Sequence, residues 1–191
     1  MITKQSSYSP IGVFDSGLGG LTVLKSLEKI LPNESFIYFG DTAHVPYGTK
    51  SAETVLRYSR HIMDFFLMHR TKAVVIACNT ASAVAFRPLQ DLYNMPLFDV
   101  VSPSVEYSMT ISETNNIGVI GTTSTIHSQA YTQTFERFGS DCTIYEIACP
   151  LFVPIIEEGW YDDPIAREVA EIYLHNFTER NIDILILGCT H

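Results

Sequence analysis

The sequence predicts an α/β fold made of two similar three-layer α/β units with mainly parallel sheets, related by a pseudo-twofold axis, with the active site between them. Short apolar runs of β-type alternate with segments of helical periodicity along the whole chain, as in strand–helix–strand units. Three positions of the first half recur in the second at offsets of 106, 107 and 111 residues: Ile11 with Ile117, Ile37 with Ile144, and Cys78 with Cys189. We therefore expect a first domain at residues 1–98 and a second at residues 99–191.

Bulk composition restricts the classes of protein to which the chain can belong. Its 191 residues are 46% hydrophobic and 17% charged, an ordinary balance for a folded chain. The net charge of −9, with 12 scattered Lys and Arg residues, argues against a nucleic-acid partner. No apolar run approaches the roughly 20 residues that span a bilayer, and residues 1–10 are too polar for a signal peptide. We expect a cytoplasmic protein with no membrane partner.

The first expected strand runs into a glycine-rich loop. Ile11–Phe14 is an apolar run followed by Asp15-Ser16-Gly17-Leu18-Gly19-Gly20, after which leucines recur at helical spacing. The loop matches neither the dinucleotide fingerprint, whose third glycine is replaced by Thr22, nor the P-loop pattern. Asp15 and Ser16 fit a helix cap and an active-site pair equally well.

A second loop, at residues 41–48, follows the strand expected at residues 35–40. Its proline and glycine exclude regular structure. Asp41 stands at a distance that suits a ribose-binding acid, so dinucleotide binding is an alternative, weakened by the broken fingerprint. Ser51 with Thr54 opens a long amphipathic helix whose apolar stripe we expect in the core.

The remaining expected elements alternate between strands and helices. We expect a strand ending at Cys78, further strands near residues 96–101, 117–121, 143–148 and 184–188, and helices at about 79–90, at 122–138 and from Asp163-Pro164 onward. Ligands of open α/β sheets bind beyond the carboxyl ends of strands, where the following helices present their N-termini. Cys78 and Cys189 both stand at such an end.

Two thiols placed on opposite sides of one carbon would suit a racemisation. One thiolate removes a proton, a planar carbanion forms, and the opposite thiol returns a proton to the other face. A thiol has an unperturbed pKa of about 8.5, and a helix N-terminus favours its thiolate. No lysine stands at a strand end to carry pyridoxal, so we expect no cofactor. Cys189 and His191 could supply two metal ligands, but no other Cys/His cluster lies near them, and we expect no metal.

Five separated motifs together resemble the glutamate racemases of the aspartate/glutamate racemase family. They are Phe14–Val23, Val45–Gly48, Ala77–Ala81, Val153–Glu157 and Gly188–His191, in the family's order over nearly the whole chain. The resemblance implies cofactor-independent interconversion of L- and D-glutamate, a small-molecule substrate, for bacterial peptidoglycan synthesis, and it allows a homodimer. Aspartate racemases share the two-cysteine plan but differ in the first loop, so Asp15-Ser16 favours glutamate.

The resemblance also assigns roles by motif. Cys78 and Cys189 resemble the two bases, with Asp15 assisting Cys78, and His191 with Glu157 assisting Cys189. The positions that match the family's substrate contacts are Asp15, Ser16, Tyr47, Gly48, Asn79, Thr80, Thr122, Thr125, Thr190 and His191.

The resemblance departs at the last motif. Family members continue for several dozen residues beyond Cys-Thr-His, so the second domain is expected to lack the family's C-terminal part. Three alternatives follow for function: a truncated, non-catalytic binding module of the same fold, an aspartate racemase, or a thiol- or zinc-dependent hydrolase that uses Cys189 and His191.

Overall fold

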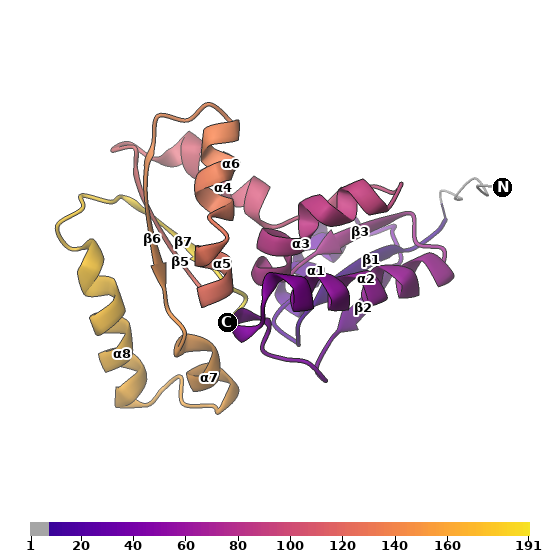
Figure 1. Cartoon of the computed structure of the whole chain (residues 1–191), viewed down its shortest axis with the longest axis horizontal. Helices are drawn as coiled ribbons and strands as arrows, with labels where there is room; N and C mark the ends of the chain where they lie inside the picture. Colours follow the sequence, from indigo (N-terminus) through magenta and orange to yellow (C-terminus); the bar gives the residue numbers. More distant parts are fainter. Residues whose placement is uncertain (1–7) are drawn as a thin grey trace. The chain divides into compact units, whose positions relative to one another are not determined.

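The computed structural model describes residues 8–191, which form two compact units (Figure 1). The first comprises the residues up to Val100 together with Thr190, and the second comprises Val101–Cys189 together with His191. Each unit is an α/β structure and is described by itself. The elements of the first unit are β1 (Ile11–Asp15), α1 (Leu21–Ile30), β2 (Phe36–Gly40), the 3-10 turn η1 (Tyr47–Thr49), α2 (Ala52–Met68), β3 (Ala73–Ile76), α3 (Asn79–Leu92) and β4 (Leu97–Phe98).

The first sheet has the strand order β2-β1-β3-β4, and every pair is parallel. β1 is central: Asp15 pairs with Gly40 of β2, and Phe14 pairs with Ile76 of β3. β2 lies on one side of β1, and β3, the next strand in the chain, lies on the other side. The strand order therefore reverses at β1, and open α/β sheets bind ligands at such a reversal. The loops after β1, β2 and β3 therefore meet at one edge of the sheet.

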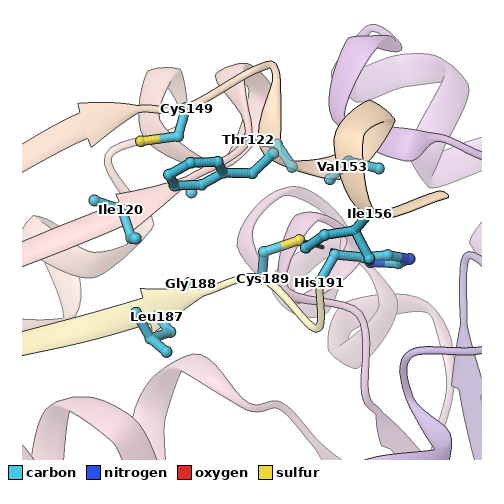
Figure 2. A pocket seen from close by; sticks show the side chains of 11 residues that line it. Ile120, Thr122, Cys149, Val153, Ile156, Leu187, Gly188, Cys189 and His191 are labelled. Atoms are coloured by element: carbon cyan, nitrogen blue, oxygen red, sulfur yellow. Dashed lines mark hydrogen bonds between the residues drawn. The ribbon is translucent and has the colours of Figure 1, made fainter. Parts of the chain in front are cut away.

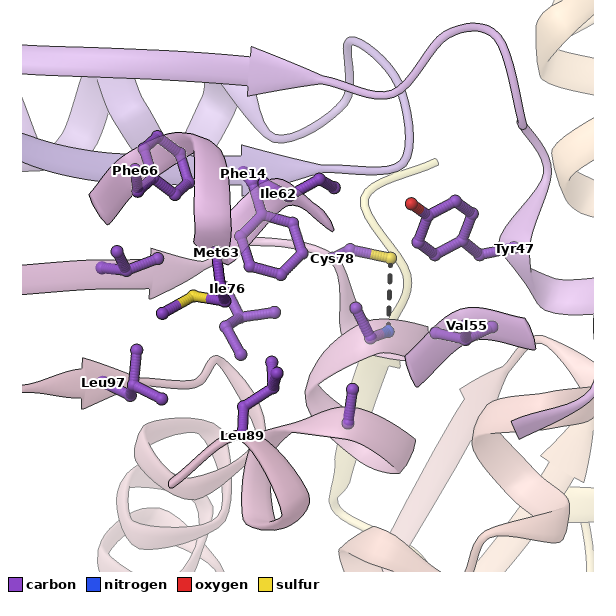
Figure 3. Close-up of a cluster of buried hydrophobic side chains, with 13 residues drawn as sticks. Phe14, Tyr47, Val55, Ile62, Met63, Phe66, Ile76, Cys78, Leu89 and Leu97 are labelled. Carbon is purple, nitrogen blue, oxygen red and sulfur yellow. Dashed lines mark hydrogen bonds between the residues drawn. The ribbon is translucent and has the colours of Figure 1, made fainter. Parts of the chain in front are cut away.

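Helices α2 and α3 pack against each other and bury one face of this sheet. Ser51 caps α2 by accepting a hydrogen bond from the Thr54 amide at 3.2 Å, as the sequence predicted. The predicted apolar stripe of α2 contributes Val55, Ile62, Met63 and Phe66 to the core. Figure 3 shows this cluster, with Cys78 and Tyr47 at one end of it. The interior that supports Cys78 is thus fully packed.

The second unit repeats the arrangement with fewer strands. Its elements are α4 (Val101–Ile111), β5 (Asn116–Gly121), α5 (Thr123–His127), α6 (Ala130–Arg137), β6 (Thr143–Ala148), α7 (Phe152–Glu157), α8 (Pro164–Leu174), the 3-10 turn η2 (His175–Phe177) and β7 (Ile184–Gly188). The parallel sheet has the order β6-β5-β7, so β5 occupies the central place that β1 has in the first unit. Two α/β units with parallel sheets are confirmed.

One expected helix is wrong in its extent. The sequence predicted a single helix over residues 122–138, but the structure breaks it into α5 and α6 at Gln129, whose φ is +54°. The left-handed conformation at this residue cannot continue an α-helix. Asp163 caps α8 with Pro164 in the first turn, as expected. In the described residues 8–191, no helix combines the length and apolarity needed to cross a membrane.

Candidate active site

Cys78 lies between β3 and α3 and caps the helix. Its sulfur accepts a hydrogen bond from the Ala81 amide at 3.4 Å, the bond drawn in Figure 3. Its thiol donates towards the Ser16 hydroxyl at 3.6 Å, and the residue is 5% exposed. A sulfur at a helix N-terminus with an N–H directed at it is placed to carry negative charge. Asn79 and Thr80, both buried, form the first turn of the same helix.

The loop after β1 brings a buried carboxylate to the same edge. Asp15 is fully buried, and its Oδ2 accepts a hydrogen bond from the Gly17 amide at 2.9 Å. The helix-cap alternative for Asp15 and Ser16 is wrong, because α1 begins after Gly20 and no side chain caps it. Asp15 therefore ends the central strand, and Ser16 follows it within 3.6 Å of the Cys78 sulfur.

The loop after β2 is held by a second buried carboxylate. Tyr47 and Gly48 are buried in η1, and the Tyr47 hydroxyl donates a 2.5 Å hydrogen bond to Asp41. Burial, and then the carboxylate of Asp41, raise the pKa of Tyr47 far above its ordinary value, so its hydroxyl keeps its proton. Asp41 is thus engaged by protein groups, unlike the ribose-binding acid that the dinucleotide alternative requires.

Cys189 follows β7 and lines a pocket of about 250 Å³ in the second unit (Figure 2). The pocket is lined by the ends of β5 and β7, by the residues that follow β5, β6 and β7, and by α7, namely Ile120, Gly121, Thr122, Cys149, Phe152, Val153, Ile156, Leu187, Gly188, Cys189 and His191. Most of these side chains are apolar. The Cys189 sulfur therefore has apolar side chains on one side and the polar pair His191 and Glu157 on the other. The other pocket thiol, Cys149, is buried, and burial raises its pKa to about 11.

The polar pair is His191 and Glu157. The Nε2 atom of His191 lies 2.5 Å from Glu157 Oε1, and its Nδ1 atom lies 4.0 Å from Cys189 Sγ. Its hydrogen bond to Cys189, with a further contribution from the charge of Glu157, raises the pKa of His191 to about 9 despite opposing desolvation. The imidazole is therefore a cation at neutral pH, the kind of partner that stabilises a thiolate.

Thr122 and Thr125, which the resemblance gives as substrate contacts, lie together at the end of β5. Thr122 caps α5: its hydroxyl lies 2.9 Å from the Thr125 hydroxyl and accepts from the Thr125 amide at 3.2 Å. Thr190 follows Cys189 and is half-buried. Within residues 8–191, no three His, Cys, Asp or Glu side chains group so as to hold a metal ion.

In each unit, residues that the sequence singled out lie at or just after the ends of the central strand and of the strand beside it: Asp15 and Cys78 in the first unit, and Thr122 and Cys189 in the second. Residues 11–191 match the family model described as Asp/Glu/Hydantoin racemase. The chain belongs to this racemase family.

Individual relatives agree with this assignment. The chain is 48% identical to the glutamate racemase of Geobacter metallireducens over 96% of its own length and 68% of the relative's. The crystal structure of glutamate racemase from Francisella tularensis in complex with D-glutamate matches with a TM-score of 0.91 and 44% identity, covering 96% of this chain and 69% of that one. The aspartate racemase of Picrophilus torridus, at 14% identity and a TM-score of 0.65 over 95% and 80% of the two chains, shares the fold. The resemblance to glutamate racemase is confirmed.

The sequence did not indicate the role of Tyr38 in this racemase-family site. Its hydroxyl donates to the Gly17 carbonyl oxygen at 2.8 Å and so braces the loop that carries Asp15. Burial, with the charges of Asp15 and Cys78, raises the pKa of Tyr38 well above its ordinary value. A tyrosine two residues before the end of an otherwise apolar strand is the signal that could have revealed it.

The pKa of His191 gives a first testable prediction. In an NMR titration of the racemase-family chain, we expect the His191 imidazole to titrate near pH 9, and near its ordinary value of about 6.5 in the unfolded chain. Because the folded pKa is the higher one, the stabilisation by its partners is fully present below about pH 6.5 and is lost as the pH rises through 9.

Substitutions of the partners identify which of them sets this pKa. Cys189→Ala and Glu157→Gln should each lower the titration midpoint, with the larger shift for Cys189→Ala. Glu158→Gln removes the same charge as Glu157→Gln one residue further along and should leave the midpoint near 9. An unchanged midpoint in both partner variants would show that neither contact sets the proton affinity of His191.

Proposed function

We propose that the chain catalyses the cofactor-independent interconversion of L- and D-glutamate, and that Cys78 and Cys189 are its two bases. The observation that carries the proposal is a repeated arrangement: in each unit, a cysteine follows the strand beside the central one, and its sulfur contacts a polar side chain, Ser16 for Cys78 and His191 for Cys189. Near 48% identity to a glutamate racemase narrows the substrate to glutamate. The product, D-glutamate, would supply peptidoglycan synthesis in the bacterial cytoplasm.

The reaction needs one thiolate and one thiol at the start of each turnover. The thiolate on one face takes the α-proton of the amino acid, and the electron pair of the broken C–H bond stays on the α-carbon. The thiol on the other face then donates its proton to that carbon, so the configuration inverts and the two sulfurs exchange protonation states. The reverse reaction uses the same two groups in opposite roles.

The groups around each cysteine can stabilise its sulfur both as a thiolate and as a thiol. On the Cys78 side, the Ala81 amide and the α3 N-terminus stabilise the thiolate, and the buried Asp15 carboxylate favours the protonated thiol and a cationic substrate ammonium. On the Cys189 side, the His191 imidazolium offers a proton and a positive charge, and Glu157 holds the ring. Each unit of pKa mismatch between thiol and α-carbon costs about 1.4 kcal/mol, so fixed dipoles and charges must supply most of the catalysis.

The substrate contacts complete the proposal. The groups we expect to hold the two carboxylates and the ammonium are Ser16, Tyr47, Gly48, Asn79, Thr80, Thr122, Thr125 and Thr190. Amides at the starts of α3 and α5 are suited to anionic groups, because backbone N–H groups and the positive helix end point outward there. These polar groups suit an amino acid with two carboxylates better than an amino acid with an apolar side chain.

Proton exchange in heavy water tests the proposed function. The chain is incubated with L-glutamate, chelator and no pyridoxal phosphate, and NMR follows loss of the α-proton while polarimetry follows inversion. We expect both signals for glutamate and much slower signals for aspartate. Absence of exchange at every protein concentration would favour the non-catalytic binding module, and faster exchange with aspartate would favour the aspartate alternative.

A further inference from the structure

Asp41 is a buried carboxylate to which the proposed reaction gives no role. It is 8% exposed and follows β2 directly. Its amide donates to the Asp15 carbonyl oxygen at 3.0 Å, which extends the pairing of β1 and β2 by one residue and ties the second loop to the first. A carboxylate this buried is stable only when other groups satisfy its oxygens.

Two side chains of the same loop satisfy it. The Tyr47 hydroxyl donates to Asp41 Oδ2 at 2.5 Å, and His44 Nδ1 lies 2.8 Å from Asp41 Oδ1. The His44 ring stacks on Tyr58 of α2, with ring centroids 4.1 Å apart, and so fastens the loop to the helix. The Asp41 carboxylate thus links two side chains of its own loop, His44 and Tyr47.

Tyr47 links this loop to Cys78. Its ring is 1% exposed and packs in the same buried cluster as Val55 and Cys78 (Figure 3). The charges of both Cys78 and Asp15 act on its hydroxyl, so the ring lies within electrostatic reach of the proposed base and its assisting carboxylate. A shift of this ring would move the backbone of Tyr47 and Gly48, both of which we expect to contact substrate.

We propose that Asp41 is a positioning residue, which fixes Tyr47 and thereby holds the Tyr47–Gly48 backbone in the orientation that receives the substrate; this inference rests on the proposed function. Asp41 touches neither the substrate nor a reacting atom in this scheme. Its effect is on substrate binding rather than on the proton transfers. Misplacement of a positioning group by about 1 Å can cost about 10²-fold, so the effect is measurable.

The test separates KM from kcat in four variants. Asp41→Ala should raise the KM for glutamate about tenfold with kcat changed less than about threefold, the pattern of lost substrate binding. Asp41→Asn should recover most of the KM, because its amide oxygen still accepts the Tyr47 hydroxyl. Tyr47→Phe should raise KM about as much as Asp41→Ala does. The double variant Asp41→Ala/Tyr47→Phe should have a KM no higher than either single variant, because both substitutions remove the same hydrogen bond.

Tyr93→Phe is the matched control. It removes another tyrosine–aspartate hydrogen bond of the first unit, the 2.8 Å contact of Tyr93 with Asp64, and should leave KM unchanged. Equal KM values in all variants, with only a lower melting temperature for Asp41→Ala, would reduce Asp41 to a structural role and overturn the inference. If Asp41→Ala does not fold, Tyr47→Phe decides alone, because it keeps the buried ring.

Calorimetric titration of the parent chain with D-glutamate distinguishes failure of the proposed function from failure of the inference about Asp41. A parent that neither binds nor turns over glutamate would overturn the proposed function and this inference together. A parent that binds glutamate, with variants that share its KM, would overturn this inference alone.

Discussion

Replacement of either Cys78 or Cys189 by serine should lower racemisation by about three orders of magnitude or more, since a positioned acid/base group contributes about 10²–10⁴-fold. A serine hydroxyl is a far weaker acid than a thiol, so it can neither form the base nor deliver the proton at neutral pH. The remaining thiol can still remove and return a proton on its own face. We therefore expect each variant to exchange the α-proton of one glutamate enantiomer with heavy water, without inversion.

The glutamate enantiomer that each variant exchanges shows whether the two sulfurs act on opposite faces of the α-carbon. If Cys78→Ser exchanges only one enantiomer, Cys189→Ser should exchange only the other, as chiral chromatography with mass spectrometry would show. Cys142→Ser serves as the control, because this half-buried thiol contacts Asn115 at 3.7 Å and precedes the start of β6 instead of following the end of a strand. Exchange of the same enantiomer by both variants, or near-parental turnover in either, would end the two-base mechanism.

The sequence predicted the strands and the residues at their ends because both depend on local patterns. Apolar runs of strand length, followed by a cysteine and a helix-opening residue, located Cys78 and Cys189 at strand ends. The near-constant offsets between the halves predicted that β5 would take the place of β1, and the two strand orders agree. Hydrophobic periodicity determines such features within a few residues of the chain.

The contacts within a folded loop and the exact ends of some helices were not predictable in this way. The expectation for Asp41 came from its spacing to the glycine loop, but its partners Tyr47 and His44 depend on how one loop folds back on itself. Likewise, no proline or glycine marks the break at Gln129, and no clear N-cap pattern marks the start of α4 after the preceding β-type run. Sequence patterns identify elements, whereas the contacts between them require the fold.

Gly20→Ala should reduce activity about 100-fold, although this glycine contacts no substrate in the proposed mechanism. Its φ of −64° and ψ of −10° suit alanine, so backbone strain is not the reason. A Cβ at this position would lie 2.5 Å from the Asp15 Cβ and 3.0 Å from the Ala77 Cβ. Both atoms are fixed to sheet-end backbone, so relief of the clash must move Asp15 or the residue before Cys78. Misplacement of a catalytic group by about 1 Å can cost about 10²-fold.

Gly17→Ala is the matched control within the same loop. Its Cβ would meet only the Val45 side chain, at 3.6 Å, an ordinary van der Waals contact. We expect Gly17→Ala to keep activity within a few-fold of the parent, and Gly20→Ala to lose both activity and about 1–3 kcal/mol of unfolding free energy through overpacking. Kinetics and urea unfolding of the two variants check this. Equal losses in both would mean that the loop needs glycine for its conformational freedom, whereas a loss confined to Gly20→Ala would mean that the site needs room for Asp15 beside Cys78.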